Sequence, residues 1–133
     1  MSVPLAPPAT LPVLLIEDEP AVMAFVRTTL ERSGYIVLGI ASGAEAKQLL
    51  ETGQFLGIVS DNATPGGVDG AQLHAWISVH RPDLVNRIVF ITGDIANEET
   101  VAALRRTGAP YLEKPFRVQQ FIAVIEKTMG KAL

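Results

Sequence analysis

The chain has 133 residues, of which 48% are hydrophobic, and a net charge of −3, which fits one domain with a substantial core. The 11 basic residues form no Lys/Arg stripe, so the sequence argues against a nucleic-acid-binding surface. Cysteine is absent, which excludes disulfides and zinc–thiolate sites and suits the cytoplasm, and no apolar run reaches the ~20 residues that span a bilayer.

Residues 1–12 contain four prolines and no charged side chain. They lack the basic start and the continuous apolar core of a signal peptide. We therefore expect a flexible Pro-rich tail or linker over 1–12 and a single folded domain over 13–133.

Short apolar runs then alternate with stretches of helical spacing, a pattern typical of βαβ units. The runs are continuously apolar, as expected of strands with both faces covered. We predict strands at 13–16, 36–40, 56–60, 87–92 and 111–113. The expected fold is an α/β, doubly wound, flavodoxin-like (βα)5 domain with a five-stranded parallel sheet in the order 2-1-3-4-5.

The helices between these strands carry start and stop signals. The first is expected from Pro20 to Gly34, and the second from a Ser42–Glu45 capping box to Gly53. The other three carry the same kinds of signal. They are expected from Asp69 to Arg81-Pro82, from Asp94 or Asn97 to Gly108, and from about Arg117 onward.

Three carboxylates stand where predicted strands end. Glu17 and Asp18 follow the first strand, and Asp61 follows the third. In the predicted strand order these two strands are neighbours, so the three groups should meet at one edge of the sheet. A hard divalent cation would relieve their repulsion, although a solvated acidic loop is the alternative. Thr92 and Lys114 come at the ends of the fourth and fifth strands.

Four motifs in this order resemble those of a response-regulator receiver domain of two-component signal transduction, over about residues 12–130. They are Leu14-Leu15-Ile16-Glu17-Asp18-Glu19-Pro20, Asp61 with Pro65-Gly66 and Asp69-Gly70, Ile91-Thr92-Gly93, and Tyr111-Leu112-Glu113-Lys114-Pro115-Phe116. The chain departs from the family in its longer loop after Asp61, where Gly67 and Val68 stand in place of one residue.

The resemblance implies a Mg²⁺ site. Asp18 and Asp61 would be direct ligands, Glu17 would act through water, and the carbonyl of Ala63 would supply another oxygen. Asp61 would also be the phosphoacceptor and would form an aspartyl-phosphate.

The resemblance also assigns roles to three residues at the other strand ends. Lys114 would contact a phosphoryl oxygen, and the bond to Pro115 is typically cis in this family. Thr92 would donate a hydrogen bond to the phosphoryl group and Tyr111 would turn inward as the switch aromatic. From residue type alone, Lys114 could be an ordinary surface lysine, Thr92 a capping residue and Tyr111 a half-buried edge aromatic.

The implied function is phosphorelay signalling, with a histidine kinase or a histidine phosphotransfer protein as the partner. The domain would not be a turnover enzyme and would bind neither nucleic acid nor membrane. Phosphorylation would reshape the face formed by the last two helices and strand 111–113, which could also pair with a second copy. The chain could be a stand-alone regulator or a part of a hybrid histidine kinase.

Two other functions remain open at this point. One is an interaction module with a receiver fold that works without phosphorylation. The other is a flavodoxin-like nucleotide-binding domain, although the acidic segment Glu17-Asp18-Glu19 stands where a Gly-rich phosphate loop would be needed. His74 and His80 are six residues apart and so do not share a helix face. We expect them to be surface or packing residues, Trp76 to be core, and Arg105-Arg106 to be solvated.

Overall fold

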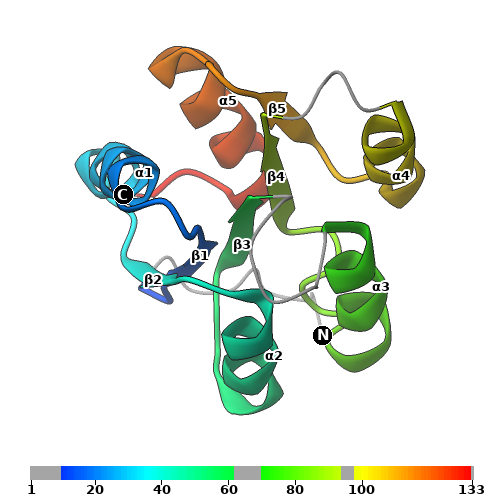
Figure 1. Ribbon diagram of the computed structural model, residues 1–133. Coiled ribbons are helices and arrows are strands. Elements are labelled where there is room, and N and C mark those ends of the chain that lie inside the picture. Colours follow the sequence, from blue (N-terminus) through cyan, green and yellow to red (C-terminus); the bar gives the residue numbers. More distant parts are fainter. Residues whose placement is uncertain (1–9, 62–69, 94–97, 133) are drawn as a thin grey trace, which may run out of the picture.

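The computed structural model describes residues 10–61, 70–93 and 98–132. Its strands are β1 (Val13–Ile16), β2 (Val37–Ile40), β3 (Gly57–Asp61), β4 (Ile88–Thr92) and β5 (Tyr111–Glu113). All pairings are parallel, and the strands form one sheet in the order β2-β1-β3-β4-β5, as predicted (Figure 1). The five helices are α1 (Pro20–Arg32), α2 (Gly43–Thr52), α3 (Gly70–His80), α4 (Glu98–Thr107) and α5 (Val118–Met129).

The helices form two layers, with α1 and α5 on one face of the sheet and α2, α3 and α4 on the other (Figure 1). Each layer has its own hydrophobic core. The α1–α5 core includes Val26, Leu30, Phe121 and Ile125, and the opposite core includes Leu50, Leu73, Ile77 and Leu104. Because both faces are covered, β1, β3 and β4 are buried along their whole length.

The helix ends follow the local signals in the sequence. Ser42 is the N-cap of α2, and its hydroxyl accepts a hydrogen bond from the backbone N–H of Glu45 at 3.3 Å. Gly34 and Gly108, just after α1 and α4, have φ of 95° and 75°, conformations that glycine adopts without strain.

Hydrogen bonds to backbone carbonyls tie the elements together at the amino ends of the strands. Arg87 donates to the carbonyl oxygens of Leu56 (2.6 Å) and Met129 (2.7 Å), and the hydroxyl of Tyr35 donates to that of Gly130 (2.6 Å). The carboxyl end of α5 is therefore fixed to the segments that lead into β2, β3 and β4.

The structure corrects some details of the sequence-based prediction. Strands β2 and β4 begin one residue later than expected, and β3 is displaced by one residue, so that Asp61 is its last residue. Trp76 is only partly buried: it packs against the core of α2, α3 and α4, but Lys47 lies over its ring and the ring of His80 stacks on it at 4.4 Å. Among the described residues, no helix has the length and apolar character needed to cross a membrane.

Candidate metal centre at the carboxyl end of the sheet

Pairing of β1 with β3 brings distant acidic residues together. Ile16 pairs with Ser60, so the next residues, Glu17 just after β1 and Asp61 at the end of β3, lie side by side although 44 positions separate them in the sequence. Both side chains are buried, with 3% and 7% of the residue exposed. The switch point of the doubly wound sheet thus carries the expected acidic pair.

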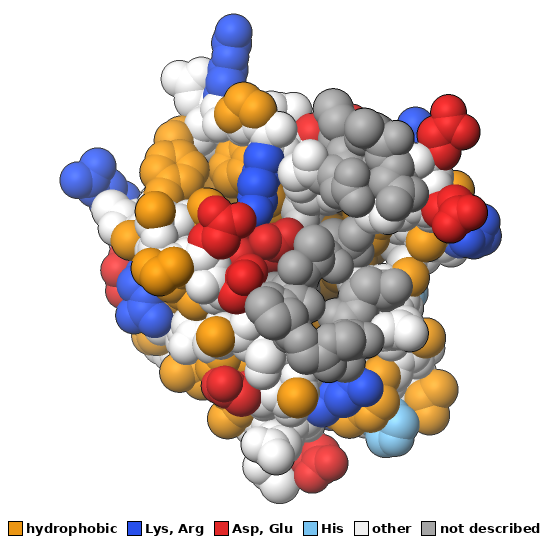
Figure 2. Space-filling view, in the orientation of Figure 1, with side chains coloured by type: hydrophobic (Ala, Val, Ile, Leu, Met, Phe, Trp, Pro, Cys, Tyr) orange, Lys and Arg blue, Asp and Glu red, His pale blue; other side chains and the backbone are white. Residues whose placement is uncertain are grey.

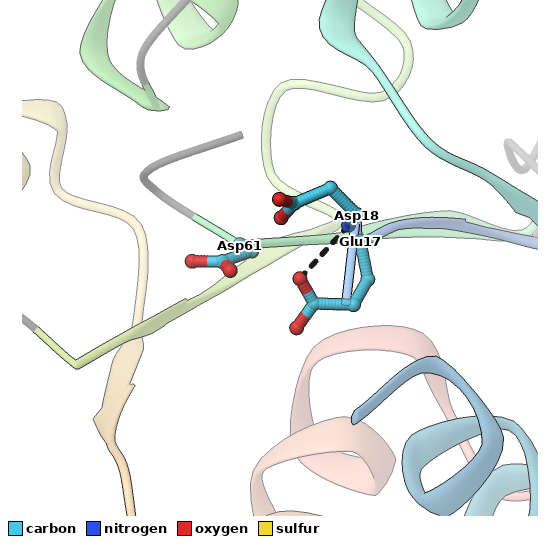
Figure 3. A group of neighbouring side chains, drawn as sticks. All are labelled: Glu17, Asp18 and Asp61. Atoms are coloured by element: carbon cyan, nitrogen blue, oxygen red, sulfur yellow. Dashed lines mark hydrogen bonds between the residues drawn. The ribbon is translucent and has the colours of Figure 1, made fainter. Parts of the chain in front are cut away.

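Asp18 completes a cluster of three carboxylates (Figure 3). One oxygen from each of Glu17, Asp18 and Asp61 lies within 4.8 Å of the others. Asp18 is the most accessible of the three, and its backbone N–H donates to Glu17 Oε2 at 3.0 Å. This hydrogen bond fixes the Glu17 carboxylate beneath Asp18.

Lys114 brings a positive charge into the same cluster from the segment after β5. Its Nζ lies 3.1 Å from Asp61 Oδ2 and 3.3 Å from Glu17 Oε1. Side chains along a strand alternate between the two faces of the sheet, which explains this convergence. Glu17, Asp61 and Lys114 each come two positions after a strand residue that faces the α1–α5 core, so they point toward the same side. Those strand residues are Leu15, Val59 and Leu112. The bond between Lys114 and Pro115 is cis, as the resemblance implied.

Burial and the repulsion between neighbouring carboxylates shift pKa values within the cluster. Burial is the main cause that raises the pKa of Glu17 to about 7, and hydrogen bonding and repulsion from Asp61 add to it, whereas Lys114 opposes it. Burial alone would lower the pKa of Lys114, but hydrogen bonds and attraction from Asp61 and Glu17 raise it above its usual value. The ammonium group therefore stays charged between two carboxylates.

The donor set suits a hard divalent cation. The three groups offer only carboxylate oxygens, the ligands that Mg²⁺ prefers, and oxygens bound to one Mg²⁺ lie roughly 3–4 Å apart. The separations of up to 4.8 Å in the cluster are close to this value, and the exposed side at Asp18 leaves room for water ligands. The residues therefore fit a magnesium site. Ala63, the fourth ligand position expected from the sequence, lies outside the described residues.

Thr92 and Tyr111 lie on strands next to the cluster. Thr92 is the last residue of β4, is 1% exposed, and comes from the strand beside Asp61. Tyr111 begins β5 and is half-buried against the core of α2, α3 and α4. As the predicted strand bounds implied, Thr92 ends its strand, whereas Tyr111 begins the neighbouring one.

Two features of this region escaped the sequence reasoning. A shallow apolar groove of about 330 Å³ opens beside Lys114 and is lined by Ala21, Val22, Phe25, Pro115 and Phe116. Figure 2 shows hydrophobic side chains beside the acidic group near the middle of this face. The second feature is a hydrogen bond of 3.1 Å from Arg105 Nε to the Tyr111 hydroxyl. The apolar motif residue Phe116 could have indicated the groove. The spacing of Arg105 and Tyr111 in the sequence gave no indication of their hydrogen bond.

The chain is similar to a known family and to several of its members. The family model "Response regulator receiver domain" matches residues 13–126. The response regulator receiver protein CpdR of Brucella abortus is 32% identical over 117 residues, covering 88% of this chain and 95% of CpdR. The transcriptional regulatory protein GltR of Pseudomonas aeruginosa is 27% identical over 120 residues, which are 90% of this chain but 49% of GltR. The chain thus spans about half of GltR.

Solved structures share this architecture. The receiver domain of a sensor histidine kinase from Pseudomonas aeruginosa superposes with a TM-score of 0.79 at 24% identity, covering 92% of this chain and 100% of that domain. That structure has a magnesium ion coordinated in its active site cleft. At this level of identity the likeness is one of fold.

Proposed function

Because the chain belongs to the response regulator receiver family, we propose that it accepts a phosphoryl group on Asp61 and passes on a signal in a two-component phosphorelay. One observation carries the proposal. The buried carboxylate of Asp61 lies 3.1 Å from the Lys114 ammonium group and beside two further carboxylates that suit a metal. This is a site built to balance charge around one acceptor oxygen.

The reaction is a displacement at phosphorus, with phosphohistidine of a histidine kinase or a histidine phosphotransfer protein as the donor. An Asp61 carboxylate oxygen forms the new O–P bond while the N–P bond breaks. The electron pair of the broken bond stays on the imidazole nitrogen, which takes up a proton. Asp61 is itself the acceptor, so the domain is not a turnover enzyme acting on an external substrate.

Asp18 and Asp61 would hold Mg²⁺ directly, with Glu17 acting through water and the carbonyl of Ala63 as a further ligand. The chemistry that Mg²⁺ supplies when bound is to offset negative charge on the phosphoryl oxygens. Support for this assignment comes from the all-oxygen donor set of the three carboxylates.

Lys114 would exchange its present partners for the phosphoryl group. Its Nζ now contacts oxygens of both Glu17 and Asp61, so a short movement would place it against a phosphoryl oxygen. Thr92 would donate a hydrogen bond to the same group, and Tyr111 would turn inward in response. These contacts would exist only in the phosphorylated state, and their formation would reshape the α4–β5–α5 face. A homodimer could form through this same surface.

The groove beside Lys114 supports a protein as the phosphoryl donor. A donor must bring its phosphohistidine to Asp61 from solvent, so its surface will cover the rim of the site. Phe25, in that rim, is 46% exposed, and Phe116 packs against it with the ring centres 6.1 Å apart. An apolar patch of this kind is typical of a protein–protein contact.

We propose that residues 13–133 form the receiver unit and that residues 1–12 are a linker or tail. The unit could act alone or within a longer chain such as a hybrid histidine kinase.

Asp61→Asn provides the test. Acetyl phosphate with Mg²⁺ should add one phosphoryl group that is stable in acid but labile to hydroxylamine, as expected of an acyl phosphate. Asp61→Asn should abolish the labelling, detected by intact mass. Asp83→Asn is the matched control, because Asp83 is an exposed aspartate paired with Arg81 outside the site. Label mapped to serine, threonine or histidine, or retained in Asp61→Asn, would overturn the proposal. Absence of any labelling in the wild type would favour an interaction module that works without phosphorylation.

A further inference from the structure

A hydrogen bond joins the last turn of α4 to the first residue of β5. Arg105 Nε donates to the hydroxyl of Tyr111 at 3.1 Å. The bond is the main reason why the pKa of the Arg105 guanidinium group lies above its usual value, and the charge of Glu113 contributes as well. The bond lies at the surface, so the Tyr111 hydroxyl is held toward solvent.

Tyr111 and Thr92 lie on the same face of the sheet. Tyr111 pairs with Phe90, and both pack against the core of α2, α3 and α4. Thr92 follows Phe90 by two residues on β4, so its side chain leaves the same face one step nearer the carboxyl end. A Tyr111 ring that turns toward Thr92 therefore moves along this face, away from Arg105.

We propose that Arg105 is a positioning residue that holds Tyr111 in its outward position and thereby opposes the switching of the Asp61 site. The inference rests on the proposed function and adds a residue that regulates it. The inward position of Tyr111 requires the bond to Arg105 to break, so the bond stabilises the unswitched state alone.

Because the two positions of Tyr111 are coupled to the Asp61 site, the Arg105 bond should affect ligand affinity at that site. A ligand that favours the inward state has to shift the equilibrium against the Arg105 bond, which weakens its apparent affinity. Removal of the bond should strengthen the binding of a phosphoryl mimic at Asp61 by the same factor. One exposed side-chain hydrogen bond corresponds to roughly a threefold change.

The test measures the dissociation constant of beryllofluoride in the presence of Mg²⁺ by amide NMR. Arg105→Ala should bind about threefold more tightly than the wild type. Arg106→Ala is the matched control, because the neighbouring Arg106 is also exposed but lies along the outer side of α4 with Glu98, Glu99 and Ala102. It should leave the affinity unchanged. In a Tyr111→Phe background, which lacks the hydroxyl, Arg105→Ala should have no further effect.

A second readout follows the Tyr111 ring itself. Without beryllofluoride, its ring proton shifts in Arg105→Ala should move toward those of the saturated wild type. The inference would be overturned if Arg105→Ala bound beryllofluoride no more tightly than the wild type. It would also be overturned if Arg105→Ala strengthened binding equally in the Tyr111→Phe background. In either case, normal binding by the wild type would leave the proposed function intact. Failure of the wild type to bind beryllofluoride at all would overturn both.

Discussion

The positive charge of Lys114 stabilises the carboxylate cluster before any metal or phosphoryl group binds. Its ammonium group contacts two buried carboxylates, which would otherwise repel one another without compensation. Removal of one partner from such a buried group leaves uncompensated charge, which destabilises a fold more than the loss of an exposed ion pair.

Lys114→Met should therefore lower the free energy of unfolding in metal-free buffer, by about 1–2 kcal/mol. The same change leaves a more negative cluster, so Mg²⁺ should stabilise the variant more than the wild type. Urea denaturation with EDTA and with Mg²⁺ measures both effects. Lys131→Met, at an exposed lysine after α5, is the control and should change neither. An equal magnesium effect in Lys114→Met and wild type would contradict the assignment of Lys114 to the cluster.

Among the elements, α5 depends on contacts at its carboxyl end as well as on its apolar face. Tyr35 is 3% exposed and donates its hydroxyl proton to the carbonyl oxygen of Gly130, just after the helix. Burial is the main cause that raises the pKa of Tyr35 above its usual value of 10.0. Loss of that proton would remove the hydrogen bond and place a negative charge beside a carbonyl oxygen.

The raised pKa of Tyr35 predicts a loss of stability at alkaline pH. Because the folded state holds this proton more tightly than the unfolded state, the contribution of the neutral phenol is complete below pH 10 and is lost as pH rises through the folded pKa. The free energy of unfolding, measured from pH 8 to 11, should fall less steeply in Tyr35→Phe than in the wild type. Tyr111→Phe retains Tyr35 and should keep the steeper fall. Parallel curves for Tyr35→Phe and wild type would contradict this account.

The elements that the sequence predicted best are those with local causes. Continuous apolar runs located the strands, and Ser42, Gly34 and Gly108 marked helix ends, because these residues act on their own segment of backbone. The carboxylate cluster was also predictable, since the ends of neighbouring parallel strands must meet. The bonds that Arg87, Tyr35 and Arg105 make depend on the final packing of distant segments, so no pattern in the sequence contains them.

In the whole molecule, the sheet separates two cores, and the proposed switch, Thr92 and Tyr111, would have to connect its two sides. Glu17, Asp61 and Lys114 leave their strands toward the α1–α5 layer, whereas Thr92 and Tyr111 face the layer of α2, α3 and α4. Thr92 ends the strand next to Asp61 and is thus the residue through which a change at the cluster would reach the opposite layer.

Thr92→Ala should accordingly retain phosphorylation but restrict its effects. Beryllofluoride with Mg²⁺ should shift wild-type amide resonances from Asp61 through Thr92 to Tyr111 and α4, because the added group gains a hydrogen bond only in the switched state. In Thr92→Ala the shifts should stay close to the cluster. Thr29→Ala, which removes another buried threonine hydroxyl but from α1, should show the wild-type spread. Full propagation in Thr92→Ala would exclude Thr92 as the connection.

The two helical layers bear on whether two partner proteins could bind the domain at the same time. The groove beside Lys114 belongs to α1 and the segment after β5, whereas Tyr111 and Arg105 face the layer on the other side of the sheet. A protein seated over the groove would cover α1 and the segment after β5, whereas one that reads Tyr111 would contact the last turn of α4 and the start of β5. Under the proposed function, delivery of the phosphoryl group at the groove and recognition of its arrival at Tyr111 would take place on opposite faces of the sheet, so the two events could overlap in time.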